Sequence, residues 1–147
     1  DRLLKAGNAY WAVVVKAQHQ VAAGWVAHTQ GRKDDALKLM QSAASLEYSA
    51  QTHDTLNPGP IGMTAHEALG ELLLDSRRAP EALKAYETSL KHAPNRFNAL
   101  VGAARAADQA GDKDKARKYY AALVALTEKA SADRPEIGEA RKHVAGR

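Results

Sequence analysis

The sequence predicts an all-α fold, and three observations support this prediction. The apolar residues are mainly Ala and Leu, which favour helices, and the chain has a single Phe. The one dense run of β-branched residues, Val13–Val15, lies inside a stretch whose apolar residues have helical spacing. A pair of small residues, Gly70 and Ala82, recurs further along the chain, with the same mutual spacing, as Ala104 and Ala116. This recurrence predicts repeated helical units.

Composition excludes several classes of function. The net charge is +4, but acidic and basic residues are interleaved, so we expect no nucleic-acid partner. The chain has no cysteine, which excludes disulfides, thiolate metal sites and cysteine nucleophiles. No apolar run reaches the roughly 18 residues that a membrane span needs, so we expect no membrane insertion. The 147 residues are enough for one domain with a core, and we treat 1–147 as a single domain.

The first helix is expected from about residue 9 to residue 29 and has an unusually broad apolar arc. Its two apolar stripes consist of Tyr10, Val14, Ala17, Val21 and Trp25, and of Trp11, Val15, Ala22 and Val26. Such an arc implies neighbours on more than one side. The residues before it fit the tail of an earlier helix, so we expect a fragment of a longer array. Loss of upstream repeats would expose this helix and allow a homo-oligomer to form through it.

Three units of two helices each are expected at residues 17–50, 63–96 and 97–130. Each unit has two small residues twelve positions apart: Gly24 and Ala36, Gly70 and Ala82, Ala104 and Ala116. We expect each pair to lie where the two helices cross, with small side chains that let the backbones approach closely. Gly70 and Ala104 are 34 residues apart, which is the length of one repeat. The first two units are further apart than this, because a segment at residues 51–62 is inserted between them.

Glycine and proline predict where the helices end. Gly31 and Gly111 suit the left-handed conformation after a helix, and Pro80 suits a first helical turn. The insertion 51–62 contains two prolines and is expected to be a loop, which acts either as a spacer or as a functional segment. Residues 133–146 predict a last helix, capped by Asp133, that closes the array with a polar face.

The middle unit resembles the tetratricopeptide repeat. The segment "AHEALGELLLDSRRAPEALKAYETSLKHAPN" carries residues typical of the family in the family's places: Leu69, Gly70, Ala82, Tyr86, Leu90 and Pro94. His66 stands where the family often has Trp, and Arg77 where it often has Gly. The third unit matches less fully, through Gly111, Ala116 and Tyr120, and the first unit is the most divergent. The resemblance covers about 110 of the 147 residues.

This resemblance implies a right-handed α-solenoid of antiparallel helix-turn-helix repeats with a C-terminal capping helix. The segment "PNRFNALVGAARAADQAGDKDKARKYYAAL" is also similar to the carboxy-terminal arrays of some long bacterial repeat proteins. A bacterial protein of either the cytoplasm or the periplasm fits this resemblance, which does not decide between the two.

The family's concave face, lined by the first helix of each repeat, usually binds peptides or protein segments. The resemblance therefore implies a protein or peptide partner and a set of groove residues. By position these are Gln18, Val21, Trp25, His28, Thr64, Glu67, Glu71, Leu74, Asn98, Val101, Arg105 and Asp108. Trp25 can stack on an aromatic or proline-containing ligand, whereas Glu67 and Glu71 favour a basic one.

Some members of the family grip a terminal carboxylate with Lys, Asn and Arg side chains. The matching positions here are Val21, Trp25, Ala68, Asn98 and Gly102. Four of these five side chains cannot supply a strong donor, so we do not expect this mode of binding.

No pattern predicts catalysis. "AHEALGE" lacks the second His of a zinc-protease motif, because Gly70 stands in its place. His53 and Asp54 are the least implausible catalytic pair, and phosphate-binding loops and nucleophile elbows are absent. We therefore expect a non-catalytic scaffold without metal or cofactor. Two alternatives stay open: an oligomerisation module, and an accessory domain of a larger enzyme.

Overall fold

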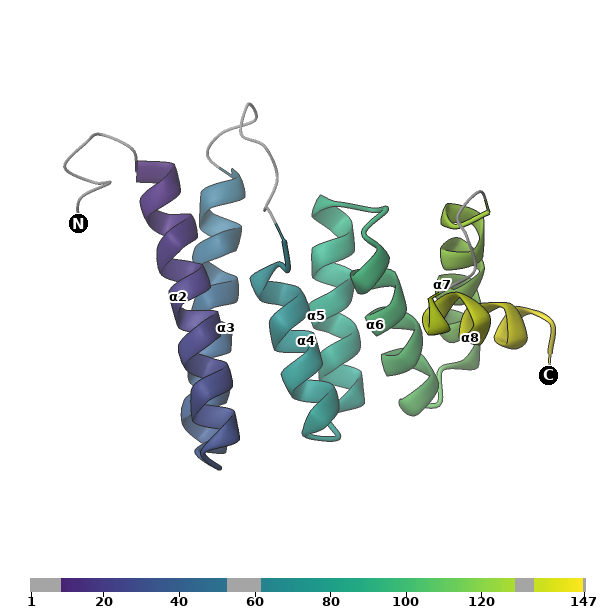
Figure 1. Ribbon diagram of the computed structural model, residues 1–147, viewed down its shortest axis with the longest axis horizontal. Coiled ribbons are helices and arrows are strands. Elements are labelled where there is room, and N and C mark those ends of the chain that lie inside the picture. The colour runs from purple at the N-terminus through teal and green to yellow at the C-terminus, as the bar shows by residue number, and fades with distance from the viewer. Residues whose placement is uncertain (1–8, 53–61, 129–133, 147) are drawn as a thin grey trace. The chain divides into compact units, whose positions relative to one another are not determined.

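The computed structural model describes residues 9–52, 62–128 and 134–146, which form seven helices and no strand. This confirms the all-α prediction (Figure 1). The helices are α2 (Ala9–Thr29), α3 (Lys33–Thr52), α4 (Ala65–Asp75), α5 (Ala79–His92), α6 (Phe97–Gln109), α7 (Lys113–Leu126) and α8 (Pro135–Val144). The possible earlier helix at the N-terminus and nearly all of the insertion 51–62 lie outside the described residues.

The chain forms two compact units, Asp1–Leu69 and Gly70–Arg147, with the division inside α4. In the first unit α2 and α3 lie side by side as an antiparallel pair (Figure 1). The second unit contains the end of α4 followed by α5 to α8. The repeat boundaries and the single-domain assignment derived from the sequence stay predictions.

The turns between paired helices use the left-handed conformation, as the glycines predict. Gly31 has φ 76° and Gly111 has φ 80°, and Pro80 lies in the first turn of α5. At the corresponding point between α4 and α5 the chain has Arg77, with φ 57°. A non-glycine residue is strained by about 1–2 kcal/mol in this region. The register of the repeat therefore imposes the turn even where the residue does not favour it.

The small residues of the repeat are buried, but the glycines have a more specific role than the sequence indicates. A Cβ on Gly24 would lie 3.1 Å from Met40 Cγ, and a Cβ on Gly70 would lie 2.7 Å from the ring of Tyr86. Tyr86 also lies against α6, where a Cβ on Gly102 would lie 2.2 Å from the ring. The glycines thus make room for one large side chain on the neighbouring helix.

The last helix begins with Pro135 in its first turn, as expected. The N-cap position is held by Arg134, which makes no side-chain capping hydrogen bond, and Asp133 lies outside the described residues. Ile137 and Ala140 of α8 are buried, and Gly146 has φ 73° just beyond its end.

Candidate interaction surface

The candidate groove residues of the first predicted repeat lie on α2 and differ in how accessible they are. Val21 is buried, and Gln18 donates a hydrogen bond from Nε2 to the Met63 carbonyl at 3.3 Å. The Trp25 ring is partly exposed and meets the His28 ring edge to face, with centroids 5.8 Å apart and an interplanar angle of 79°. Trp25 and His28 therefore form an aromatic pair that is accessible on the first helix.

Two candidates from the second predicted repeat, Thr64 and Glu67, form a reciprocal capping box at the start of α4. The Thr64 backbone N–H donates to Glu67 Oε2 at 2.9 Å, and the Glu67 N–H donates to Thr64 Oγ1 at 3.0 Å. The Glu67 side chain is only 2% exposed. The expectation that Glu67 is open to a basic ligand is therefore wrong, because its carboxylate satisfies a helix end.

A second acidic group, Glu47 of α3, completes this N-terminus. Its Oε2 accepts a hydrogen bond from the Ala65 backbone N–H at 2.8 Å and lies 3.7 Å from His66 Nδ1. The first N–H groups of a helix have no partner within the helix and carry a partial positive charge, so a carboxylate there is stabilising. Glu47 is therefore a structural residue that fixes α4 against α3.

The other two candidates on α4, Glu71 and Leu74, are exposed and half-buried, respectively. Glu71 thus keeps its predicted availability to a basic ligand.

Most candidate groove residues of the third predicted repeat already have partners inside the protein. Val101 is buried, and Asp108 accepts a hydrogen bond from Lys113 Nζ at 2.7 Å across the α6–α7 turn. Arg105 Nε lies 3.1 Å and 3.2 Å from the two carboxylate oxygens of Glu139 on α8. The fourth candidate, Asn98, is exposed at the start of α6. Asn98 is therefore the candidate of the third predicted repeat that is most accessible to a ligand.

Glu139 joins three helices. Besides its contact with Arg105 of α6, Glu139 accepts a hydrogen bond from the Tyr120 hydroxyl of α7 at 2.7 Å. The Tyr120 ring stacks on the His143 ring of α8, with the ring centroids 4.2 Å apart. The hydrogen bond from Arg105 lowers the pKa of Glu139, against the opposing effect of burial. Burial and the Glu139 carboxylate raise the pKa of Tyr120. This cluster holds α8 on α6 and α7.

A second polar cluster joins α5 to α7. Glu87 accepts hydrogen bonds from Lys115 Nζ and the Tyr119 hydroxyl, both at 2.9 Å. Burial alone would raise the pKa of Glu87, but these hydrogen bonds outweigh it and lower that pKa. Burial and the bond to Glu87 raise the pKa of Tyr119 to about 12.

The positions at which some members of the family bind a terminal carboxylate are unsuitable in this chain for a second reason. Val21, Ala68 and Gly102 are all buried, so ligand atoms cannot reach them. Across the described part of the chain no group of three His, Asp or Glu residues could hold a metal ion. Among the described helices none has the length and apolarity to cross a membrane.

Sequence reasoning missed three residues that organise these surfaces: Glu47, Gly102 and Glu139. Glu139 lies one repeat length after Arg105, so the repeat period itself could have paired them. Gly102 lies as far after Tyr86 as Gly70 lies before it, and this symmetry was also present in the sequence.

The comparisons with known proteins agree with this architecture. Residues 67–135 match the family model described as a tetratricopeptide repeat. No curated protein sequence matches the chain.

Three solved structures are similar to the chain at low identity. PcrH in complex with the chaperone binding region of PopD is 21% identical, with a TM-score of 0.65 over 88% of each chain. The Yersinia enterocolitica type III secretion translocator chaperone SycD is 17% identical, with a TM-score of 0.60 over 89% of this chain and 87% of SycD. A tetratricopeptide-like protein from Chlorobium tepidum is 18% identical, with a TM-score of 0.59 over 93% of this chain and 97% of that protein. At these identities the likeness concerns the fold alone. The family model over residues 67–135 shows that this part of the chain consists of tetratricopeptide repeats.

Proposed function

We propose that this protein is a non-catalytic interaction scaffold that binds a peptide or protein segment on the first helices of its repeats. The fold supports this, since helical repeats present long surfaces for extended ligands. The complex of PcrH with the chaperone binding region of PopD shows that a protein of similar fold binds a protein segment.

The accessible pair of Trp25 and His28 carries the proposal. Trp is over-represented where binding energy is concentrated, because it buries a large rigid surface on contact. α2 has only one charged residue, Lys16, so a ligand on this helix loses little solvation of charge. We therefore expect a segment with proline or an aromatic residue at this position. In the second unit the exposed Glu71 favours a basic residue in the ligand.

A fluorescence experiment tests the role of Trp25. The chain has two tryptophans, so a Trp11→Phe variant leaves Trp25 as the only indole. Peptides selected on the wild-type protein from a displayed random library serve as probes, and their binding is expected to change the Trp25 emission. Trp25→Ala is expected to weaken the selected peptides by about tenfold or more.

Trp11→Ala is the matched control, because Trp11 lies on the same helix but was not predicted to face the ligand. Peptides that bind Trp25→Ala as tightly as the wild type, with the control also unchanged, would refute the proposed site. A Glu71→Lys variant distinguishes binding at the second repeat from binding at the first. It is expected to weaken the binding of basic peptides and to leave the Trp25 fluorescence response to other peptides intact.

Self-association through α2 is a second candidate function. Val15 is 54% exposed and Val26 is 52% exposed, and Ala22 lies exposed between them at helical spacing. This stripe is apolar, and α2 contains no acidic residue. Two copies that pair along this stripe would remove both valines from water, and because each is already about half buried, each contributes about 1 kcal/mol.

A further inference from the structure

The exposed stripe of α2 that contains Val15, Ala22 and Val26 also includes a titratable residue, His19. It lies four residues after Val15 and three before Ala22, and its side chain is exposed like theirs. At 3.6 residues per turn, His19 lies about 40° around the helix from Val15 and about 20° from Val26. The imidazole is therefore in the middle of the surface through which two copies would pair.

The spacing of this stripe fits a second copy of the same chain. Its four residues are separated by four, three and four positions, so the pattern is the same in both directions. A closed dimer uses one self-complementary patch on both copies, and alternating steps of three and four are the spacing of paired helices. In an antiparallel pair Val15 then meets the partner's Val26. His19 meets the partner's Ala22, whose small side chain leaves room for the ring.

Protonation of His19 adds charge to a helix that has no acidic residue to oppose it. The one charged residue of α2 is Lys16, three positions before His19, and it is also a cation. His28, the second histidine of α2, is nine residues away and lies on the opposite side of the helix. A protonated His19 is therefore not neutralised by its own helix.

The acidic side chains of the elements that contact α2 are occupied or distant. Glu47 of α3 and Glu67 at the start of α4 are buried, and both accept hydrogen bonds from backbone N–H groups. The remaining charged residues of α3 lie in its first two turns, next to the end of α2 and away from its middle: Lys33, Asp34, Asp35 and Lys38. No carboxylate of α3 or of the start of α4 is thus available to an imidazolium at His19.

The antiparallel pair brings the two imidazoles close together. They lie three residues apart along the helix direction, which is about 4.5 Å. Burial between two helices and a second imidazolium both disfavour the charged form of histidine. We propose that protonation of His19 separates the two copies, so that α2 pairs at neutral and alkaline pH and dissociates in acid. This inference rests on the self-association through α2 proposed above.

Sedimentation equilibrium of the full chain at pH 8 and pH 5.5, in the same salt and with EDTA, tests the proposal. Histidine is the side chain whose charge ordinarily changes within this range. Each dimer that forms must release a proton from both imidazoles, so the dissociation constant is expected to rise by about tenfold or more at pH 5.5. EDTA removes any metal ion that could bridge the two rings.

Two variants locate the effect at His19. His19→Gln, which stays neutral, is expected to associate equally at both pH values. His19→Lys, which is charged at both, is expected to be weak at both. His92→Gln is the matched control, because His92 is an exposed histidine on α5, and it should keep the wild-type response to pH.

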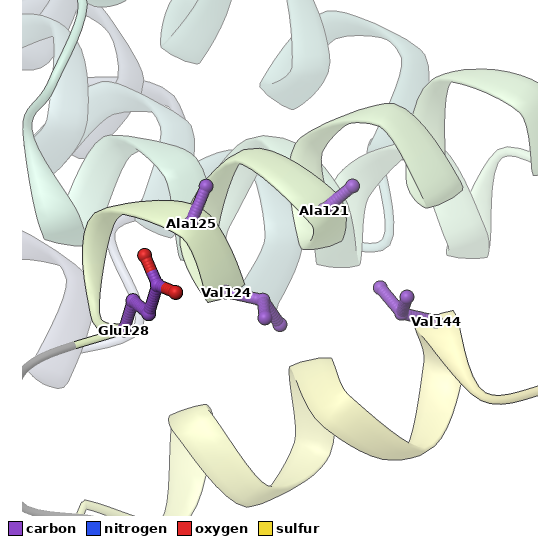
Figure 2. Close-up of a pocket in the computed structure, with 5 residues that line it drawn as sticks. All are labelled: Ala121, Val124, Ala125, Glu128 and Val144. Carbon is purple, nitrogen blue, oxygen red and sulfur yellow. The ribbon is translucent and has the colours of Figure 1, made fainter.

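Another exposed apolar surface provides a control for non-specific association. A shallow hollow of about 320 Å³ lies between α7 and α8, and Figure 2 shows the Val124 and Val144 side chains between the two helices. Val144 is 44% exposed, which is close to the exposure of Val26. Val144→Glu is therefore expected to leave the association and its response to pH unchanged, whereas Val26→Glu weakens the association.

Cross-linking tests the direction of pairing, because the chain has no cysteine of its own. A mixture of Val15→Cys and Val26→Cys proteins at pH 8 is expected to form a mixed disulfide dimer under mild oxidation. Each protein alone should not, since antiparallel pairing places identical positions about 16 Å apart along the helix. Cross-linking of each protein with itself, and not with the other, would overturn the antiparallel arrangement.

The outcomes distinguish the two proposals. A monomer at pH 8 up to millimolar concentration would refute self-association through α2, and the role of His19 with it. Association that is equal at both pH values, or a response to pH that persists in His19→Gln, would refute the role of His19 alone. Far-UV circular dichroism at both pH values checks that each protein is folded, so that unfolding is not taken for dissociation.

Discussion

Gly102→Ala is expected to destabilise the protein, although Ala is the better helix former. Gly102 lies inside α6, where an added methyl group would lie 2.2 Å from Cε1 and Cζ of the Tyr86 ring. The ring cannot retreat toward α4, because an added Cβ on Gly70 would already lie 2.7 Å from its other side. Tyr86 is 5% exposed, so it cannot swing into solvent without leaving the core.

The size of the effect follows from two opposing contributions. Overpacking a close-packed core costs about 1–3 kcal/mol, and this contact is at the severe end because the ring is confined on both faces. Replacing Gly by Ala inside a helix favours the folded state by about 1 kcal/mol. We expect a net loss of about 2 kcal/mol, which corresponds to a fall in Tm of roughly 6 °C for a chain of this size.

Urea and thermal unfolding followed by circular dichroism measure this loss. Gly138→Ala is the matched control, since Gly138 is also helical but has nothing within 4 Å of an added Cβ. It is expected to raise stability by about 0.5–1 kcal/mol. In a Tyr86→Leu background, Gly102→Ala should lose most of its cost, because the smaller side chain leaves room. A Gly102→Ala protein as stable as Gly138→Ala would refute the reasoning.

Three further predictions concern the turn, the last helix and the first helix. Arg77→Gly is expected to raise the free energy of unfolding by about 0.5–1 kcal/mol, because it relieves the strain at φ 57°. Glu139→Gln is expected to weaken the attachment of α8. Since the pKa of Glu139 is lowered in the folded state, its contribution to stability is present above the unfolded pKa of about 4.3. This contribution is lost as the pH falls through the pKa of the folded state. Val26→Glu is expected to shift any dimer toward monomer in sedimentation equilibrium, because it places a charge in the exposed stripe of α2.

Each of these has a control on a nearby exposed residue. Ser76→Gly, beside Arg77, is expected to lower stability, since it adds unfolded-state entropy and relieves no strain. Glu128→Gln should leave the acid-side loss of stability unchanged, whereas Glu139→Gln should reduce it. Ser42→Glu on α3 should leave sedimentation unchanged. A monomer at every concentration for the wild-type chain would remove self-association as a function of α2.

The helices and their turns could be predicted from the sequence because they depend on local chemistry. Gly31 and Gly111 take up the left-handed conformation that the sequence leads one to expect, and Pro80 lies in a first turn. Arg77 shows the limit of this approach, because its own preference is for negative φ. The place of Arg77 in the repeat, equivalent to that of Gly111, is the one signal in the sequence that indicates this conformation.

The interaction surface was less predictable, since it depends on which polar groups the protein itself uses. Thr64 and Glu67 have the Thr-x-x-Glu spacing of a capping box, a local signal that could have excluded Glu67 as a ligand residue. Arg105 gave no such local signal. Its partner Glu139 lies on α8, so its engagement depends on how a distant helix packs.

The aromatic side chains of the second helices show why the end of the array differs from its middle. Tyr86 lies midway in the sequence between Gly70 and Gly102, and its ring lies against both glycines. Tyr120 follows Ala104 at the same interval, but the residue at the matching position after it is Glu136. A glycine that receives the ring is therefore missing on that side.

Polar contacts take the place of the missing glycine. The Tyr120 ring stacks on His143, and its hydroxyl donates to Glu139. Glycine permits close packing of a ring on a helix and gives no hydrogen bond, whereas Glu139 fixes the position of the hydroxyl and of Arg105 together. The last helix is thus placed by a charged hydrogen-bond network, and its attachment, unlike that of α6, should depend on pH.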